Sequence, residues 1–387
     1  MSTTNINLRT VGIGAALSAI VAGHLIHAFG WRQAALFAVG LGAGLVLYHA
    51  AFGFTSAWRK LTVHGDSSGV RAQVVMLGVT AAIFLPLLAG GEFLGTEMSP
   101  SNRPLGLSVI VGAFVFGLGM QLGGGCASGT LFTVGGGSVR MLATLAAFVA
   151  GSVLGALHRP SWEQAPGLEP VSLLGEFGLA GALSTTALLL VVLWLGSMRF
   201  EQSRKGAVRS IVSGTQSFSW LQGPWPLVAG AVGLAVVNIA TLVLAGRPWG
   251  VTSGFALWGS KIVAVLGVDV ASWGYWQSPA NAAALEGSVF ANITSVMNFG
   301  IILGALIAAG LAGRYAPTWR VPARSLLAAV LGGILLGYGA RIAYGCNIGA
   351  FFSGVSSSSL HGWLWLVAAF AGSTIGTRMR PWFGLAN

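Results

Sequence analysis

The sequence has few charged residues. Only 7% of its 387 residues are charged, whereas 55% are hydrophobic, and the mean hydropathy is +0.79. These values exclude a soluble globular domain, because such domains contain about a quarter charged residues. The first apolar run, "VGIGAALSAIVAGHLIHAF" at 11–29, is not followed by a small-residue cleavage site, so we expect a retained helix and not a signal peptide. A nucleotide-binding phosphate loop is also missing, which excludes an ATPase domain within this sequence.

Cysteine is almost absent. The only two, Cys126 and Cys346, lie 220 positions apart, which argues against a disulfide framework, and structural metal sites need four clustered ligands. His24, His27 and His49 admit a haem or metal interpretation. Haem, however, needs axial ligands that face each other from separate helices, and no second histidine pair has the required depth. We therefore expect no metal and no cofactor.

Acidic residues are scarce too, with 9 Asp and Glu against 20 Lys and Arg, for a net charge of +11. In a soluble protein this excess would suggest nucleic acid. In a membrane protein, basic residues in short loops set the orientation instead, so we expect no nucleic-acid partner. A positively charged protein also favours anions over cations near the mouths of a pathway.

Long apolar runs, in contrast, are abundant. They are long enough to cross a bilayer core of about 30 Å as helices. They predict membrane spans at 11–29, 34–53, 73–90, 106–122, 140–158, 174–196, 226–246, 289–313, 325–343 and 360–378. The pieces at 123–138 and 344–359 are too apolar for surface loops and too rich in glycine or serine for long helices; such backbone survives at membrane depth only when buried or lining a cavity. The sequence thus predicts an all-α integral membrane protein with about 9–10 transmembrane helices plus short re-entrant helices.

The two cysteine segments, "MQLGGGCASGTLF" at 120–132 and "ARIAYGCNIGAFF" at 340–352, form an internal repeat. A shift of 220 superposes Gly117 on Gly337, Gly119 on Gly339, Gly125 on Gly345, Cys126 on Cys346, Gly129 on Gly349 and Phe132 on Phe352. A second echo, at a shift of 197, links "GFTSAW" from Gly53 to "GVTSGF" from Gly250. The shared order predicts a first membrane repeat at 1–200, a cytoplasmic linker at 201–225 and a second membrane repeat at 226–387.

Loop charge predicts the orientation of these repeats. Basic residues follow the second and the sixth predicted span, which places both loops in the cytoplasm. They are Arg59, Lys60, Arg71, Arg199, Arg204, Lys205 and Arg209. Because each repeat has an odd number of spans, the second is inverted relative to the first, and both termini are expected in the cytoplasm. Inverted repeats with broken helices and a site near mid-membrane are typical of transporters.

The glycines around each cysteine can build a site for an anion. Gly125, Gly129, Gly345 and Gly349 let the backbone approach a ligand closely and leave amide N–H groups free. Short helices that begin after the cysteines would direct positive dipole ends to the same place. The alternative is that these glycines only let helices pack closely. Packing does not explain, however, why the only cysteines recur among them.

The thiols allow two chemistries. A neutral thiol offers a weak S–H donor to a soft, sulfur-bearing anion, whereas a thiolate would repel a dianion at low dielectric. We favour the neutral thiol, and with it a transporter and not an enzyme. The alternatives are a membrane sulfurtransferase or thiol redox enzyme that carries a cysteine persulfide, or simply a small buried hydrophobic cysteine. An enzyme would need a base beside the thiol, and neither cysteine has a histidine nearby in the sequence.

Four further residues are candidates for the pathway. Arg341 lies in an apolar span five residues before Cys346, where an unpaired charge is costly, so we expect it to face the pathway; snorkelling to the interface is the alternative. Lys261 in "LWGSKI" either attracts anions or anchors the chain at the interface. Thr55 and Thr252 belong to the two Thr-Ser motifs.

The segment "GRPWGVTSGFALWGSKI" at 246–262, together with the two G-C-x-x-G loops, resembles the YeeE/YedE family of bacterial inner-membrane transporters, whose characterised members take up thiosulfate. The resemblance extends over nearly the whole chain in the same two-repeat order. It implies a multi-pass inner-membrane protein with an hourglass-like fold, in which two cavities meet at a thin centre. It also implies that thiosulfate or a closely related sulfur anion passes along cysteine thiols without a covalent intermediate.

The chain departs from this family at one position. Thiosulfate-transporting members typically carry a third cysteine near the end of the early Gly-Phe motif, where this chain has Thr55. A hydroxyl still donates a hydrogen bond, and a stronger one than a thiol. Some relatives are linked to selenium or other sulfur compounds, so a selenium-compound transporter is an alternative. Related proteins often work beside a small SirA/TusA-like sulfur carrier in the cytoplasm, and we expect no such domain to be fused here.

Overall fold

The computed structural model describes residues 5–212 and 219–387. Within these ranges, nine helical stretches are long and apolar enough to cross a membrane. The helices are α1 (Leu8–Phe29), α2 (Trp31–His49), α3 (Phe54–His64), α4 (Ser68–Gly90), α5 (Leu107–Gly123), α6 (Ala127–Gly135), α7 (Val139–Glu163), α8 (Leu173–Lys205), α9 (Leu227–Ala245), α10 (Thr252–Val265), α11 (Pro279–Glu286), α12 (Ile293–Leu311), α13 (Ala323–Ile342), α14 (Ser353–Ser356) and α15 (Leu360–Met379). The protein is thus an all-α integral membrane protein.

Short elements complete the fold. Three are 3₁₀ turns, η1 (Val270–Ser272), η2 (Gly274–Gln277) and η4 (Arg380–Phe383), and one is a short π-helix, η3 (Asn347–Phe352). The strands β1 (Glu92–Phe93) and β2 (Thr96–Glu97) form one antiparallel pair, and β3 (Leu105–Gly106) and β4 (Gly167–Leu168) form another. These strands tie together the loops that connect the long helices.

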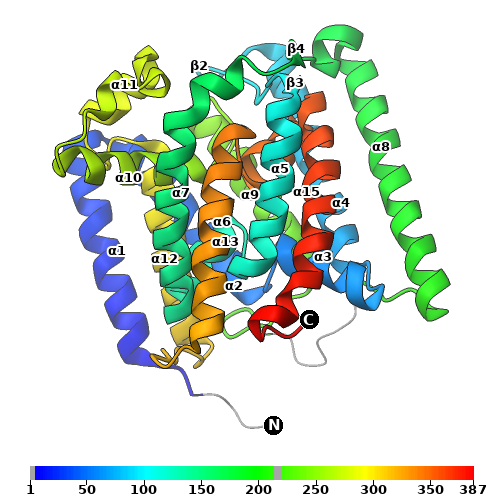
Figure 1. The fold of residues 1–387 in the computed structure, drawn as a ribbon, viewed down its shortest axis with the longest axis horizontal. Coiled ribbons are helices and arrows are strands. Elements are labelled where there is room, and N and C mark those ends of the chain that lie inside the picture. Colours follow the sequence, from blue (N-terminus) through cyan, green and yellow to red (C-terminus); the bar gives the residue numbers. More distant parts are fainter. Residues whose placement is uncertain (1–4, 213–218) are drawn as a thin grey trace.

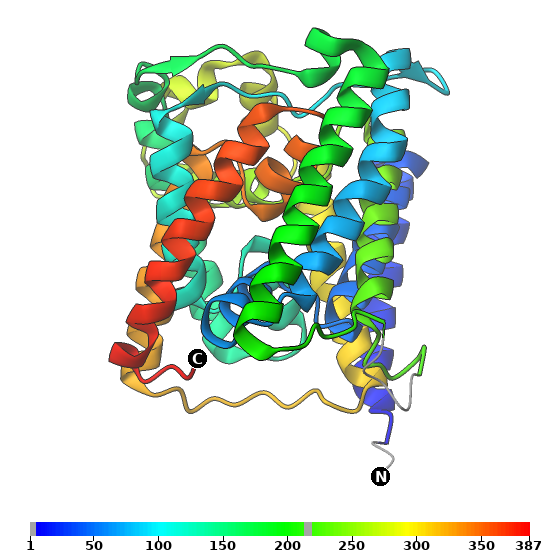
Figure 2. The same cartoon turned by 90° about the vertical axis from the view of Figure 1, so that its right-hand side faces the viewer.

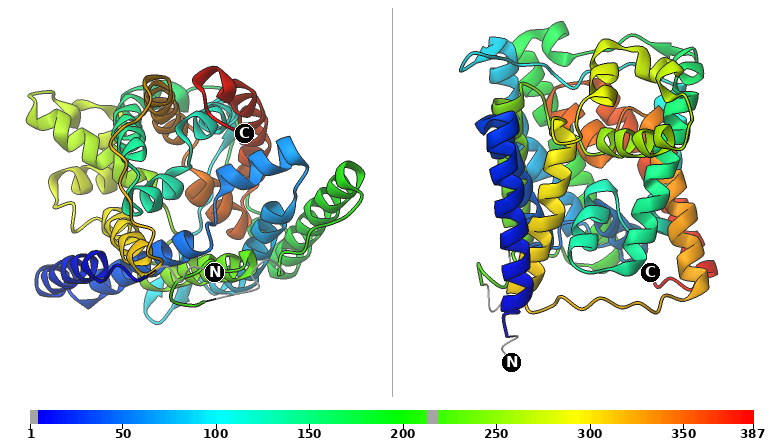
Figure 3. Two further views of the ribbon diagram at one scale, coloured as in Figure 1. Left: turned by 90° about the horizontal axis from the view of Figure 1, so that it is seen from below. Right: turned by 90° about the vertical axis from the view of Figure 1, so that its left-hand side faces the viewer.

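The long helices run between two ends of the molecule (Figure 1). The start of α1 and the C-terminus lie at the lower end, and β2, β3, β4 and α11 lie at the upper end (Figure 1). The connection between α12 and α13 crosses the lower end (Figure 2). Seen from below, α1 and α8 lie at opposite sides of the periphery (Figure 3). Only 11% of the apolar window of α1 is buried, as suits a helix that faces lipid.

Glycines allow the central helices to touch backbone to backbone. A side chain at Gly117 of α5 would overlap the carbonyl oxygen of Ala369 in α15, and one at Gly337 of α13 would overlap that of Phe148 in α7. The same helix pairs, α5 with α15 and α7 with α13, make extensive contacts along their lengths. Small residues at such crossings are the usual means of close helix packing in membranes. Residues before 200 and residues after 226 therefore share one core.

The predicted spans agree in position with the observed helices, with some differences in detail. All ten contain a helix, yet α15, at the predicted span 360–378, is not among the nine membrane-crossing stretches. Short helices begin directly after both cysteines, as predicted. The predicted linker 201–225 begins inside α8, and its residues 213–218 lie outside the described residues. The re-entrant course and the inverted repeat remain predictions.

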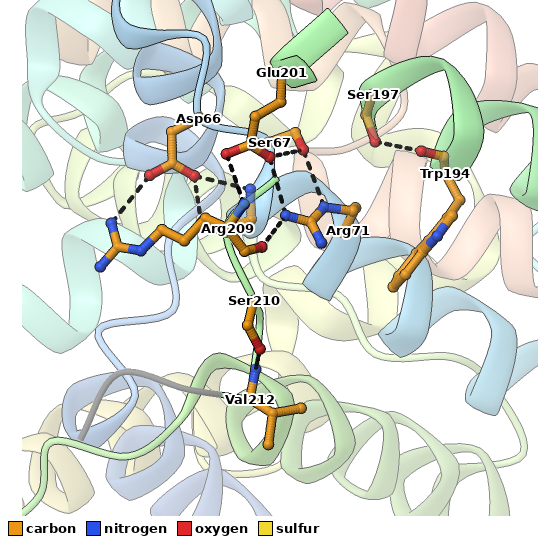
Figure 4. Close-up of polar contacts among 10 residues, drawn as sticks. Asp66, Ser67, Arg71, Trp194, Ser197, Glu201, Arg209, Ser210 and Val212 are labelled. Carbon is orange, nitrogen blue, oxygen red and sulfur yellow. Dashed lines mark hydrogen bonds and ion pairs between the residues drawn. The ribbon is translucent and has the colours of Figure 1, made fainter. Parts of the chain in front are cut away.

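A buried ion-pair cluster joins the end of α8 to the turn between α3 and α4 (Figure 4). We call Asp66, Ser67, Arg71, Glu201 and Arg209 the ion-pair cluster. The Glu201 carboxylate accepts hydrogen bonds from the Ser67 hydroxyl at 2.6 Å and from Arg71 at 3.0 Å. Arg71 also donates to the carbonyl oxygen of Arg209, and the Arg209 side chain pairs with Asp66 at 3.2 Å. The cluster thereby fixes the position of α3, which carries "FTSAW".

The Asp66 carboxylate of this cluster has a perturbed pKa. Burial raises the pKa, but hydrogen bonds from Ser68, the positive charge of Lys205 and a hydrogen bond from Arg209 outweigh burial, and the pKa lies below the ordinary value of 3.8. A carboxylate held ionised by such partners stabilises the fold while it remains charged.

Candidate functional site

The two cysteine loops meet in the interior of the protein. Cys126 immediately precedes α6 and Cys346 immediately precedes η3, each with an extended backbone. Both thiols are buried and belong to one hydrophobic cluster, and α6 lies against η3. The chain turns sharply before Cys126, where Gly124 has a φ of +93° that favours glycine. Residues far apart in the sequence thus bring the two thiols into a shared core.

Aromatic rings surround the helix that follows Cys346. The ring of Phe351 stacks on Trp365 with a centroid distance of 6.5 Å. It also meets Phe54 at 6.1 Å and Trp58 at 6.4 Å, both from α3. All four side chains are almost fully buried. They pack the segment that follows Cys346 against α3 and α15.

A recess of about 390 Å³ opens at the upper end and reaches the Cys346 loop. We call it the upper recess. Its charged lining consists of four arginines, Arg103, Arg159, Arg247 and Arg341, and one carboxylate, Glu163. An excess of positive charge in a recess with low-dielectric walls concentrates anions from solution.

Two of these arginines are held in place by the protein. The Arg341 guanidinium donates to the Tyr275 hydroxyl at 2.5 Å. Arg159 pairs with Glu163 at 2.8 Å, donates to the carbonyl oxygen of Arg341 at 2.5 Å, and lies 3.8 Å from the centre of the Tyr344 ring. These contacts hold both guanidiniums in place, and both side chains line the recess.

The other two arginines keep their donors available. Neither Arg103 nor Arg247 forms a hydrogen bond or an ion pair with any residue in the described ranges. Burial lowers the pKa of Arg103, and the charges of Arg159 and Arg341 lower it further. Burial, with a contribution from Arg103, also lowers the pKa of Arg247. Like charges crowded in this way favour a bound anion, because an anion relieves their mutual repulsion.

The structure brings four of the predicted site residues together. Arg341, Thr252, Gly345 and Gly349 all line the upper recess. The two glycines lie on either side of Cys346 in the sequence, and the Cys346 thiol is buried and does not line the recess. Arg341 thus lines a recess, and its place on an anion pathway remains a prediction.

The remaining predicted residues lie elsewhere. Cys126, Gly125 and Gly129 form the other loop, and a side chain at Gly129 would contact the Cys126 sulfur at 3.4 Å. The Thr55 carbonyl oxygen accepts a hydrogen bond from Gln121 at 3.0 Å. The Lys261 ammonium donates to the carbonyl oxygen of Leu285 and so ties α10 to α11. None of these residues lines the upper recess.

The sequence profile of a family described as "Sulphur transport" matches residues 49–375, most of the chain. The chain belongs to the sulphur transport family. Its curated relatives include the thiosulfate transporter TsuA of Spirochaeta thermophila, which is 31% identical over 349 residues, covering 84% of this chain and 92% of that protein. TsuA of Escherichia coli is 24% identical over 343 residues, covering 85% and 89% of the two chains.

A third relative matches over a shorter stretch. The "Probable transporter YedE" of Escherichia coli is 32% identical to this sulphur transport family member over 160 residues. That alignment covers 41% of this chain and 39% of YedE, so the chain matches less than half the length of that relative.

Sequence reasoning missed two arginines of this sulphur transport protein, Arg103 and Arg159, and the tyrosine Tyr275. A signal was nevertheless present. Arg103, Arg159 and Arg247 are each followed directly by proline, and all three line the upper recess. Proline disfavours a helical conformation of the preceding residue, which suits Arg103 and Arg247, both of which lie outside the helices. Arg159 is an exception, because it lies inside α7 together with Pro160.

Unpaired polar atoms lie deeper in the protein. Both side-chain amide atoms of Asn347 lack a hydrogen-bond partner among the described residues, and so does the Thr55 hydroxyl. Both side chains are buried. Asn347 directly follows Cys346, and Thr55 occupies the predicted position of a third cysteine. Buried polar groups without partners are rare, and here they leave donors free along the interior.

Proposed function

We propose that this protein imports thiosulfate, or a closely related sulfur-containing anion, across a bacterial inner membrane. The observation that carries the proposal is the upper recess, with four arginines and one carboxylate above the Cys346 loop. Membership of the sulphur transport family and likeness to thiosulfate transporters support the choice of a sulfur anion. In this orientation the upper end faces the periplasm, and both termini face the cytoplasm.

In the proposed mechanism, Arg103 and Arg247 capture the anion from solution, because their donors are not used by the protein. Arg341 then draws the anion to Gly345 and Gly349 at the floor of the recess. From there the anion passes along loop amides, the neutral thiols of Cys346 and Cys126, and the unpaired polar groups of the interior. Each contact is weak enough to release the anion, because a tight site would trap it. No covalent intermediate forms, so the protein acts as a transporter and not as an enzyme.

We further propose that the two halves are inverted repeats, with the anion pathway between them. Equivalent hydrogen bonds support this. Arg159 of α7 donates to the carbonyl oxygen of Arg341 at 2.5 Å, and Arg380 after α15 donates to the carbonyl oxygen of Gln121 at 2.6 Å. Gln121 and Arg341 are superposed by the shift of 220 that relates the cysteines. The family resemblance adds a SirA/TusA-like carrier as the cytoplasmic partner.

Growth tests the proposal. A sulfur-auxotrophic bacterium without thiosulfate uptake of its own should grow on thiosulfate as its only sulfur source when it carries this gene. Cys126→Ala and Cys346→Ala should abolish or strongly reduce this growth at equal membrane expression, because a small residue fits the loop but the S–H donor is lost. Normal growth with Cys346→Ser would show that a soft thiol contact is not required, and the thiol relay would be wrong.

An experiment with purified protein separates transport from sulfur transfer. Purified protein in liposomes should take up thiosulfate labelled in one sulfur with both sulfur atoms intact. Mass spectrometry of the protein during turnover should find both cysteines unmodified. A labelled persulfide that persists on either cysteine would instead favour the sulfurtransferase.

A further inference from the structure

A second recess, of about 460 Å³, lies at the lower end. We call it the lower recess. Arg140 at the start of α7 and Arg320 in the α12–α13 connection line it, together with the hydroxyl-bearing residues Thr133, Ser138 and Thr318. No Asp or Glu is among its described lining residues. Its charge is therefore wholly positive, as in an anion site.

Arg140 connects the lower recess to the loop of the first cysteine. Its guanidinium donates to the carbonyl oxygens of Leu122 and Gly123, both at 2.7 Å, and to the hydroxyl of Ser325 at 2.8 Å. It also lies so close to Gly124 that a Cβ there would be 2.7 Å from a guanidinium nitrogen. These residues end just before Cys126. Arg140 thus stands between the lower recess and Cys126, as Arg341 stands between the upper recess and Cys346.

Two more arginines add positive charge behind Arg140. The pKa of Arg380 is lowered to about 10, first by burial and then by the charges of Arg59 and Arg140. None of these three arginines forms an ion pair with a carboxylate in the described part of the chain. Their other partners are neutral: Arg380 donates to the carbonyl oxygen of Gln121, and Arg59 donates to the Gln121 side chain at 3.4 Å.

We propose that the lower recess is a second oxyanion-binding site, which holds the transported anion at the cytoplasmic end before release. This inference rests on the proposed import function and extends it to the exit side. Arg140 receives the anion from the Cys126 loop, and Arg320, on the lower connection, binds it from the opposite wall.

The lower recess is expected to bind an anion with lower affinity than the upper recess. The guanidinium of Arg140 already makes three short hydrogen bonds to the protein, so fewer of its donors remain for an anion. The upper recess offers Arg103 and Arg247 without such partners. Water and salt screen the charge of the exposed Arg320, which weakens its attraction for an anion further. A weaker exit site releases the anion readily, as import requires.

Arg320→Gln tests the site with little risk to folding, because Arg320 is exposed and makes no hydrogen bond with the described residues. Arg324→Gln is the matched control: it removes the same charge from an exposed position at the same end, outside the recess lining. Uptake of labelled thiosulfate is measured at low ionic strength in membrane vesicles of both orientations. The half-saturation concentration is thereby obtained separately at each face.

Arg320→Gln should raise the half-saturation concentration measured at the lower face by about fivefold. It should leave the half-saturation concentration at the upper face unchanged. Arg324→Gln should change neither. An unchanged lower face in the Arg320→Gln protein, or an equal effect of Arg324→Gln, overturns the site. If wild-type vesicles transport no thiosulfate from either face, the import proposal fails, and thiosulfate binding to purified protein then decides the site. In that case, the rise in unfolding temperature that thiosulfate causes is measured on the purified proteins. The site requires that Arg320→Gln reduces this rise and that Arg324→Gln does not.

Discussion

The ion-pair cluster predicts a large loss of stability in the Glu201→Gln variant. Glu201 has no solvent exposure, and its partner Arg71 is 4% exposed. The substitution removes the one negative charge among the described residues with which Arg71 forms an ion pair, while leaving the guanidinium buried. A buried pair broken in this way costs about 3–5 kcal/mol. Glutamine keeps one oxygen that can accept from Arg71, which places the expected loss near the lower value, about 3 kcal/mol.

Thermal unfolding of the purified protein in detergent measures this loss, at equal heating rates for all variants. Glu163→Gln serves as the control, because its pair with Arg159 has a carboxylate side chain that is 54% exposed. The Arg159 side chain is only 8% exposed, but it keeps its hydrogen bond to the carbonyl oxygen of Arg341. Because water screens the half-exposed carboxylate, we expect Glu163→Gln to lose only about 1 kcal/mol. Two apolar side chains in the double variant Arg71→Met/Glu201→Leu should recover most of the stability that Glu201→Gln loses, because no buried charge remains.

Two results would refute this reasoning. One is a Glu201→Gln protein that unfolds no earlier than the Glu163→Gln protein. The other is a double variant that is as unstable as the single one, which would show that hydrogen-bond geometry and not the unpaired charge sets the loss.

Three further predictions follow from the two ends of the molecule. Asp66 has a lowered pKa, so its contribution to stability is complete above the ordinary value of 3.8 and is lost as the pH falls below it; an Asp66→Asn protein should therefore show a smaller acid-induced drop in unfolding temperature than wild type. Arg247→Gln should raise the half-saturation concentration for thiosulfate uptake about tenfold with little change in maximal rate, whereas Arg32→Gln, at an exposed position outside the lining of the upper recess, should leave it unchanged. Reporter proteins inserted at 206–212 should be active only in the cytoplasm, and periplasmic activity would reverse the proposed orientation.

The sequence predicts the membrane helices well, because their burial in lipid requires long apolar runs. It also predicts where short helices begin, since glycines around Cys126 and Cys346 interrupt longer ones. The upper recess is different. Its arginines come from four separate segments, and only helix packing brings Arg103 and Arg159 beside Arg341.

A charged residue in an apolar segment does not by itself reveal what its side chain contacts. Lys261 and Arg341 both lie in apolar surroundings, and the sequence offers the same two interpretations for each. In the structure Arg341 faces the recess, whereas the Lys261 ammonium is occupied by the carbonyl oxygen of Leu285. That difference depends on α10 and α11, which are too short and too irregular to be recognised as spans.

The glycine contacts at the centre restrict how this protein can move. At Gly117 and Gly337 the backbones of facing helices touch, with no layer of flexible side chains between them. Sliding α5 along α15, or α7 along α13, would drive one backbone into the next turn of the other. Because each pair joins the early part of the chain to the late part, rocking of one half against the other would have to separate these backbone contacts. For the transport proposed above we therefore expect local changes, such as rotation of Phe351 and small tilts of α3.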